Sequence, residues 1–307
     1  MKESSHTTHA AKTKGTDSMI NDAAATGTAR SFTGLIHRHP LLSFFTLAYL
    51  GSWLAWSPWW LSSNGLGLFS YELPFRAIAG INQLGMFAGP FIAAFLVTHI
   101  IEGRDGVKRL WHTITQWRVK KLAYVLALLV IPAAIIGCYF LLPGGLSIGE
   151  AVSFSVVGTL ASTFFIYLLG GPFQEEPGWR GFALPRLQNM FHPIVAALVL
   201  GVVHCFWHTP LFFTEEWDTA RSDPGQLVAY LVLVVSLSVV LSWLVNAARG
   251  SVLVAILGHN TVNWALFVVA TLTGEAVANN WPAAIGMTAI AALAIIVTHG
   301  RLGYKRD

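Results

Sequence analysis

Long apolar stretches separated by short polar segments run through most of the chain. A membrane-spanning helix needs about 20 consecutive, mostly apolar residues. Eight stretches meet that requirement and predict helices at 40–61, 78–100, 122–142, 151–171, 193–213, 226–246, 252–271 and 281–299. The pattern therefore predicts an all-α integral membrane protein, a polytopic bundle of about eight transmembrane helices.

The first 30 residues differ from the rest of the chain. Residues 1–30 are rich in Ser, Thr, Ala, Lys and Gly and contain no Phe, Trp or Tyr. Such a segment cannot bury a core, and it lacks the layout of a signal peptide. We expect a disordered polar tail at 1–30 and one eight-helix membrane domain at 31–307.

Composition agrees with a membrane location. Only 11% of the residues are charged, against roughly 25% in an ordinary soluble domain. So few charges cannot cover a soluble surface of this size, and the lipid bilayer must solvate much of it. The 12 Trp residues fit as well, because indole rings favour the membrane–water interface.

The distribution of basic residues predicts the topology. The segment 102–121 carries six Lys and Arg, so it is expected to be cytoplasmic, together with both termini. Alternation through eight spans then leaves only Arg76 and Arg221, of the 19 Lys and Arg, on the opposite side. We expect a multi-pass protein of the cell (inner or plasma) membrane. The net charge of +4 is a topology signal and does not indicate nucleic-acid binding.

Two adjacent acids follow the fourth apolar stretch. Glu176 and Arg180 are four residues apart and can pair on a helix, while Glu175 lies about 100° around the helix and would be free to act. The alternative is an ordinary helix start, with acids in its first turn and Pro177 at its first position.

Two further polar pairs lie within apolar stretches. His204 and His208 are four apart in the fifth stretch, and His259 and Asn263 are four apart in the seventh. Each pair shares one helix face and can either bond to a neighbouring helix or form a site. A carboxylate, imidazoles, an arginine and an amide together can activate water.

Depth in the membrane tests whether these groups meet. At 1.5 Å per residue, His208 lies roughly 20 Å into its span. Glu175 reaches a similar depth only if the fourth helix bends at Gly170-Gly171-Pro172 and runs on to about Arg186. We therefore predict a bent fourth helix, with Glu175 within about 12 Å of His208.

At these motifs the chain resembles the CPBP family of intramembrane proteases, which includes the type II CAAX prenyl endopeptidases and bacterial Abi proteins. The family pattern is EExxxR, then FxxxH, then HxxxN. Here it reads as Glu175-Glu176 with Arg180, then His208, then His259 with Asn263. The resemblance covers about residues 75–270.

The resemblance implies a mechanism. Glu175 is the general base, His208 and His259 bind the water or the substrate carbonyl, and Asn263 stabilises the oxyanion. Glu176 and Arg180 form a supporting pair. The implied partner is a membrane-associated, CAAX-type or other peptide substrate, reached from the cytoplasm. The sequence leaves the oligomeric state open.

One departure from the family pattern concerns His204, which stands where the family has an aromatic residue. It is either a tolerated wall of the substrate pocket or an additional proton carrier or ligand. Two cofactor hypotheses also stay open. Zn²⁺ could be held by Glu175, His208 and His259, or Glu175 and the histidines could activate water without a metal.

Two other classes compete with the endopeptidase. A non-catalytic membrane protein, such as a bacteriocin self-immunity factor or a scaffold, could keep the motifs for structure. A proton-coupled transporter could use the buried Glu and His as a relay, but the chain shows no inverted repeat. No GxSG-like nucleophile lies within a span, which disfavours a rhomboid-type serine protease.

Overall fold

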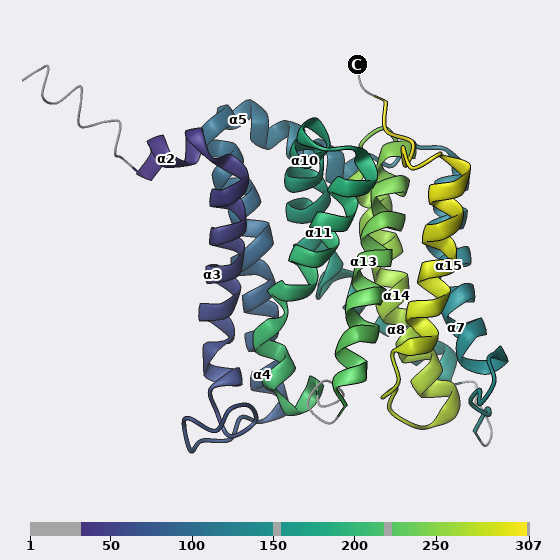
Figure 1. The fold of residues 1–307 in the computed structure, drawn as a ribbon. Coiled ribbons are helices and arrows are strands. Elements are labelled where there is room, and N and C mark those ends of the chain that lie inside the picture. The colour runs from purple at the N-terminus through teal and green to yellow at the C-terminus, as the bar shows by residue number, and fades with distance from the viewer. Residues whose placement is uncertain (1–31, 150–154, 218–222, 306–307) are drawn as a thin grey trace, which may run out of the picture.

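The computed structural model describes residues 32–149, 155–217 and 223–305. The expected polar tail at 1–30 lies outside the described residues. The described part is helical and without strands, which confirms the all-α prediction (Figure 1). The helical elements are α2 (Phe32–Arg38), α3 (Pro40–Trp60), α4 (Phe75–Met86), η2 (Phe87–Phe91), α5 (Ile92–Thr115), α6 (Lys121–Val125), η3 (Leu126–Val130), α7 (Ile131–Leu141), α8 (Ser155–Leu169), α9 (Pro172–Glu176), η4 (Pro177–Ala183), α10 (Leu184–Met190), α11 (Pro193–Trp207), η5 (Thr209–Phe213), η6 (Glu215–Trp217), α13 (Pro224–Ala247), α14 (Val252–Thr273) and α15 (Trp281–Val297).

Each of the eight predicted stretches contains helix. Among the described residues, five helices are long and apolar enough to cross a membrane: 75–115, 121–141, 156–190, 224–247 and 252–273. The helices α11 and α15 are shorter and apolar. The first of the eight predicted stretches corresponds to α3. An all-helical, multi-pass membrane fold follows from these lengths and compositions.

Two helix ends differ from prediction. The second helix continues past residue 100 to Thr115, with a break at Gly103, where φ is 65°. The fifth helix ends at Trp207 instead of reaching residue 213, and a 3-10 turn follows. Pro210 explains the second difference, because a proline disfavours the α conformation in the residue before it.

The predicted bend in the fourth helix is present. The helix α8 ends at Leu169, Pro172 restarts the chain in α9, and the helix continues through η4 and α10 to Met190. The η4 segment is π-helical, a wide turn that is frequent at functional sites. Gly178 lets η4 approach η2 closely, because a Cβ there would lie 2.7 Å from the carbonyl oxygen of Pro90.

Buried tryptophans hold the end of α11 against α3. The indole of Trp207 lies 4.8 Å from that of Trp56 between ring centroids, and its Nε1 donates a 2.8 Å hydrogen bond to Ser52 Oγ. Trp53 Nε1 donates to the carbonyl oxygen of Trp207 at 2.9 Å. These contacts fix the position of His208, the next residue.

The connections that the topology predicts to share one side gather at one end of the bundle. Figure 1 shows α2, the distal half of α5, α10 and the C-terminus at the same end. The loop between α4 and α3 and the region after α14 lie at the other end. That this end faces the cytoplasm stays a prediction.

Candidate active site

Three helical regions bring the predicted site residues together. The bent helix contributes the two acids and the arginine. The end of α11 contributes His204 and, at its C-cap, His208, and α14 contributes His259 and Asn263. The side chains of Glu175, Glu176, Arg180, His204, His208 and His259 are all buried. Buried charges of this kind must be paired or hydrogen-bonded to be stable.

Glu176 is the structural centre of the cluster. Its Oε1 accepts from Arg180 Nη1 at 3.1 Å and from His259 Nδ1 at 2.7 Å. The pair predicted between Glu176 and Arg180 therefore forms, with both side chains fully buried. The contact with His259 was not predicted, and it means that Glu176 holds the imidazole as well as the guanidinium.

Helix geometry alone suggested that the Glu175 side chain would be free, but in the structure it has a hydrogen-bond partner. Its Oε2 lies 2.8 Å from His204 Nε2. The other ring nitrogen, Nδ1, lies 3.5 Å from Arg180 Nη1. Because a guanidinium is only a donor, Nδ1 must accept, so Nε2 carries the proton and donates it to Glu175. His204 thus connects Arg180 to Glu175.

His208 and His259 are each held through Nδ1. The Nδ1 of His208 lies 3.2 Å from the carbonyl oxygen of His204, and Nδ1 of His259 faces Glu176. Because Nδ1 donates to these acceptors, Nε2 on the other side of each ring is unprotonated when the imidazole is neutral. Both imidazoles can therefore accept a proton or a hydrogen bond there. Trp217 and Tyr230 pack against the His208 ring.

A small space separates the acid from the amide. A Cβ at position 171 would lie 3.5 Å from Glu175 Oε1 and 4.0 Å from Asn263 Nδ2, with Met86 Sδ at 3.7 Å. Gly171 therefore borders the same space as the second oxygen of Glu175 and the side-chain amide of Asn263. The sequence pattern predicted only a bend at Gly171, although a glycine four residues before a candidate carboxylate, one helical turn away, also favours a close approach.

The distance predicted between Glu175 and His208 also holds. Glu175, His204 and His208 each offer one potential ligand atom, and these atoms lie within 4.8 Å of one another. His204 occupies the place in this group that the sequence assigned to His259. The predicted separation of less than about 12 Å is satisfied, so the bent helix does bring the two motifs together.

An all-helical, multi-pass membrane protein with acids and imidazoles buried among its helices is the class that fold and site define. Residues 157–265 match the family described as Type II CAAX prenyl endopeptidase Rce1-like. The chain is also similar to CAAX prenyl protease 2 of Methanococcus maripaludis, with 26% identity over 200 residues covering 60% of this chain and 72% of the relative. Both similarities support the resemblance to the CPBP family of CAAX proteases that the motifs predicted.

Proposed function

We propose that this protein is an intramembrane endopeptidase that hydrolyses a peptide bond in a membrane-associated, CAAX-type substrate. The observation that carries the proposal is the buried carboxylate of Glu175, whose Oε1 borders a small space shared with the Asn263 amide. The similarity to the CAAX prenyl endopeptidase family and to the CAAX prenyl protease of Methanococcus maripaludis supports the peptidase class and the CAAX-type substrate.

Glu175 serves as the general base in this mechanism. It removes a proton from a water molecule as the water oxygen bonds to the substrate carbonyl carbon. The resulting oxyanion accepts a hydrogen bond from Asn263 Nδ2, a stabilisation that is typically worth 10²–10³ in rate. Glu175 then returns the proton to the amide nitrogen as the C–N bond breaks, which releases an amine and a carboxylic acid.

The histidines and the second acid orient the reacting groups. His208 or His259 holds the water by accepting, at Nε2, a hydrogen bond from the O–H that Glu175 does not deprotonate. Glu176 and Arg180 keep His259 and His204 in place through the bonds already described. His204 in turn holds Oε2 of Glu175, while Oε1 lies toward Gly171.

The residues do not fit a zinc site that keeps a general base. Zinc peptidases of the HExxH kind bind the metal with two histidines and use a separate glutamate as the base. If Glu175 bound zinc, the remaining buried carboxylate would be Glu176, which is held by Arg180 and His259 through Oε1 and whose Oε2 is buried without a hydrogen-bond partner among the described residues. Both ring nitrogens of His204 also face partners. We therefore assign no step to a metal.

The test compares wild-type protein with Glu175→Gln in detergent. Each is incubated with a prenylated CAAX peptide and with the same peptide unprenylated, with and without a chelator, and products are identified by mass spectrometry. Glutamine keeps the size of the side chain and can still accept from His204. Loss of a general base is expected to lower the rate by about 10²–10⁴. Glu275→Gln is the matched control, because Glu275 is exposed and lies outside the acid–imidazole cluster, and this variant should cleave normally.

Three outcomes would contradict parts of the proposal. Equal cleavage by wild type and Glu175→Gln would remove Glu175 from the chemistry. Loss of activity with the chelator would overturn the metal-free assignment. Absence of cleavage of both peptides by folded wild-type protein would overturn the CAAX-type substrate and favour the non-catalytic membrane protein.

A further inference from the structure

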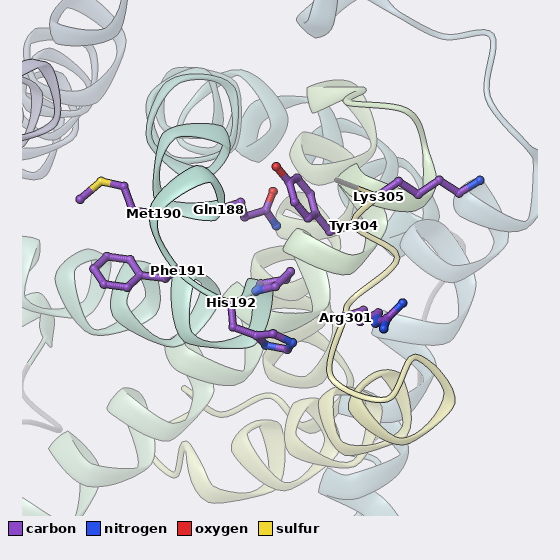
Figure 2. Close-up of a pocket in the computed structure, with 8 residues that line it drawn as sticks. Gln188, Met190, Phe191, His192, Arg301, Tyr304 and Lys305 are labelled. Carbon is purple, nitrogen blue, oxygen red and sulfur yellow. The ribbon is translucent and has the colours of Figure 1, made fainter. Parts of the chain in front are cut away.

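A pocket away from the acid–imidazole cluster lies at the end of the bundle that holds the C-terminus. Its volume is about 760 Å³, and it lies between the turn from α10 to α11 and the segment after α15 (Figure 2). The proposed peptidase chemistry uses none of these residues. We therefore consider which ligand this pocket could bind.

The walls of the pocket are fixed by specific contacts. The segment after α15 turns at Gly300, where φ is 74° and a Cβ would lie 3.5 Å from His192 Cε1. Asn246 Nδ2 donates to the carbonyl oxygen of Leu302 at 3.0 Å, and Leu302 is fully buried. Tyr304 Oη donates to Asn189 Oδ1 at 3.1 Å. The C-terminal segment is thus held over the start of α11.

The chemistry of the lining favours an anion. Arg301 and Lys305 contribute two exposed cations, and no acidic side chain lines the pocket among the residues that the structure describes. The 15-residue helix α11 begins at Pro193, and the side chain of its N-cap, His192, makes no capping hydrogen bond. The free backbone N–H groups of a helix start favour negative charge.

A buried amide provides a second, independent indication. Gln188 is 3% exposed, lines the pocket, and its Nε2 has no hydrogen-bond partner within the described part of the chain. A buried donor left without a partner is destabilising, so a ligand that accepts from it is favoured. Figure 2 shows the Gln188 side chain on the side of the pocket that faces Tyr304, with Arg301 and His192 nearby. An anionic oxygen in the pocket would accept this donor.

We propose that this pocket binds the phosphate-bearing headgroup of an anionic phospholipid. The rim has the amphipathic character that a lipid requires, because Met190 and Phe191 are 64% and 44% exposed. In Figure 2 these two apolar side chains lie on one side and the cations Arg301 and Lys305 on the other. The pocket lies at the end of the bundle that is predicted to face the cytoplasm, where anionic lipids are concentrated.

The test is native mass spectrometry of the full-length protein in detergent, titrated with phosphatidylglycerol, phosphatidylcholine or inorganic phosphate. We expect one phosphatidylglycerol to be retained at least about tenfold more tightly than phosphatidylcholine, as charge-assisted hydrogen bonds predict. Inorganic phosphate at the same concentration should not displace it. Displacement by phosphate, or equal retention of phosphatidylcholine, would overturn the assignment to an anionic lipid.

Variants separate the pocket from general surface charge. The double variant Arg301→Ala/Lys305→Ala should lose the tightly retained lipid, and Gln188→Leu should weaken it while keeping the size of the side chain. Arg104→Ala/Lys121→Ala removes the same charge from exposed positions outside the pocket and should retain the lipid as wild type does. Equal losses in the two double variants would contradict the proposal. Arg301, Lys305 and the two control residues are exposed, so their substitution should leave folding intact. A melting curve of each variant checks this.

Discussion

His204 Nε2 donates a 2.8 Å hydrogen bond to Glu175 Oε2 in the buried cluster. This imidazole stands at the position where the family pattern predicts an aromatic residue. It fixes one oxygen of the proposed base and leaves the other toward Gly171 and Asn263. We therefore propose that His204 is a positioning residue that acts through Glu175.

His204→Phe is expected to retain activity. Phenylalanine restores the aromatic of the family pattern and packs against Trp179 and Trp207, which already flank the imidazole. The loss of one buried hydrogen bond is worth about 0.5–1.5 kcal/mol, so kcat should fall by no more than about tenfold. His204→Gln, which can still donate to Glu175, should lie closer to wild type. Complete loss of cleavage in a folded His204→Phe protein would place His204 in the chemistry itself.

Arg180→Ala is expected to damage both folding and activity. The substitution leaves the charge of Glu176 fully buried without its guanidinium, which typically costs about 3–5 kcal/mol. It also removes the donor at His204 Nδ1. The melting temperature of Arg180→Ala in detergent should be clearly lower than that of the wild type. Lys108→Ala, which breaks an exposed pair with Asp105, should leave the melting temperature unchanged.

A second substitution tests the reason for that loss. Glu176→Gln in the Arg180→Ala background removes the uncompensated charge but keeps an acceptor for His259. The double variant should recover part of the thermal stability. If it were no more stable than Arg180→Ala, the buried charge would not be the cause.

The apolar pattern predicted most of the fold, because a segment in lipid must bond its own backbone and therefore becomes a helix. The depth of His208 even required the bend at Gly170 and Gly171. The widened turn from Pro177 to Ala183 was not predictable. It depends on how closely Gly178 packs against Pro90, which is a tertiary contact with no signal in local sequence.

The partners within the site were less predictable than its members. The spacing of four residues indicated that Glu176 and Arg180 pair, since that spacing defines a helix face. It could not indicate that Glu176 also bonds His259, which is 83 residues away. For the same reason the bond between His204 and Glu175 could not be inferred, because side-chain orientations on different helices are set by packing.

Asn263→Ala is expected to lower kcat without lowering stability. The amide borders the space next to Glu175 and is only half-buried, and removing one oxyanion donor typically costs 10²–10³ in kcat. Asn260 offers a matched contrast on the same helix, because its Nδ2 donates to the carbonyl oxygen of Phe164 at 3.1 Å. Asn260→Ala should lower the melting temperature instead. A normal kcat for Asn263→Ala would remove the amide from the proposed oxyanion site.

Gly171→Ala tests whether the reaction takes place in the space between Glu175 and Asn263. The added methyl would sit at ordinary contact distances, 3.5 Å from Glu175 Oε1 and 4.0 Å from Asn263 Nδ2, so the protein should fold and melt as wild type does. The methyl would nevertheless occupy the space that the water and the substrate carbonyl need. We therefore expect kcat/KM for the CAAX peptide to fall by about 10²-fold or more, since small misplacements of reacting groups cost that much. Gly158→Ala, in a helix where a Cβ meets nothing within 4 Å, is the control and should be fully active. Normal cleavage by Gly171→Ala would show that the substrate approaches Glu175 from another side.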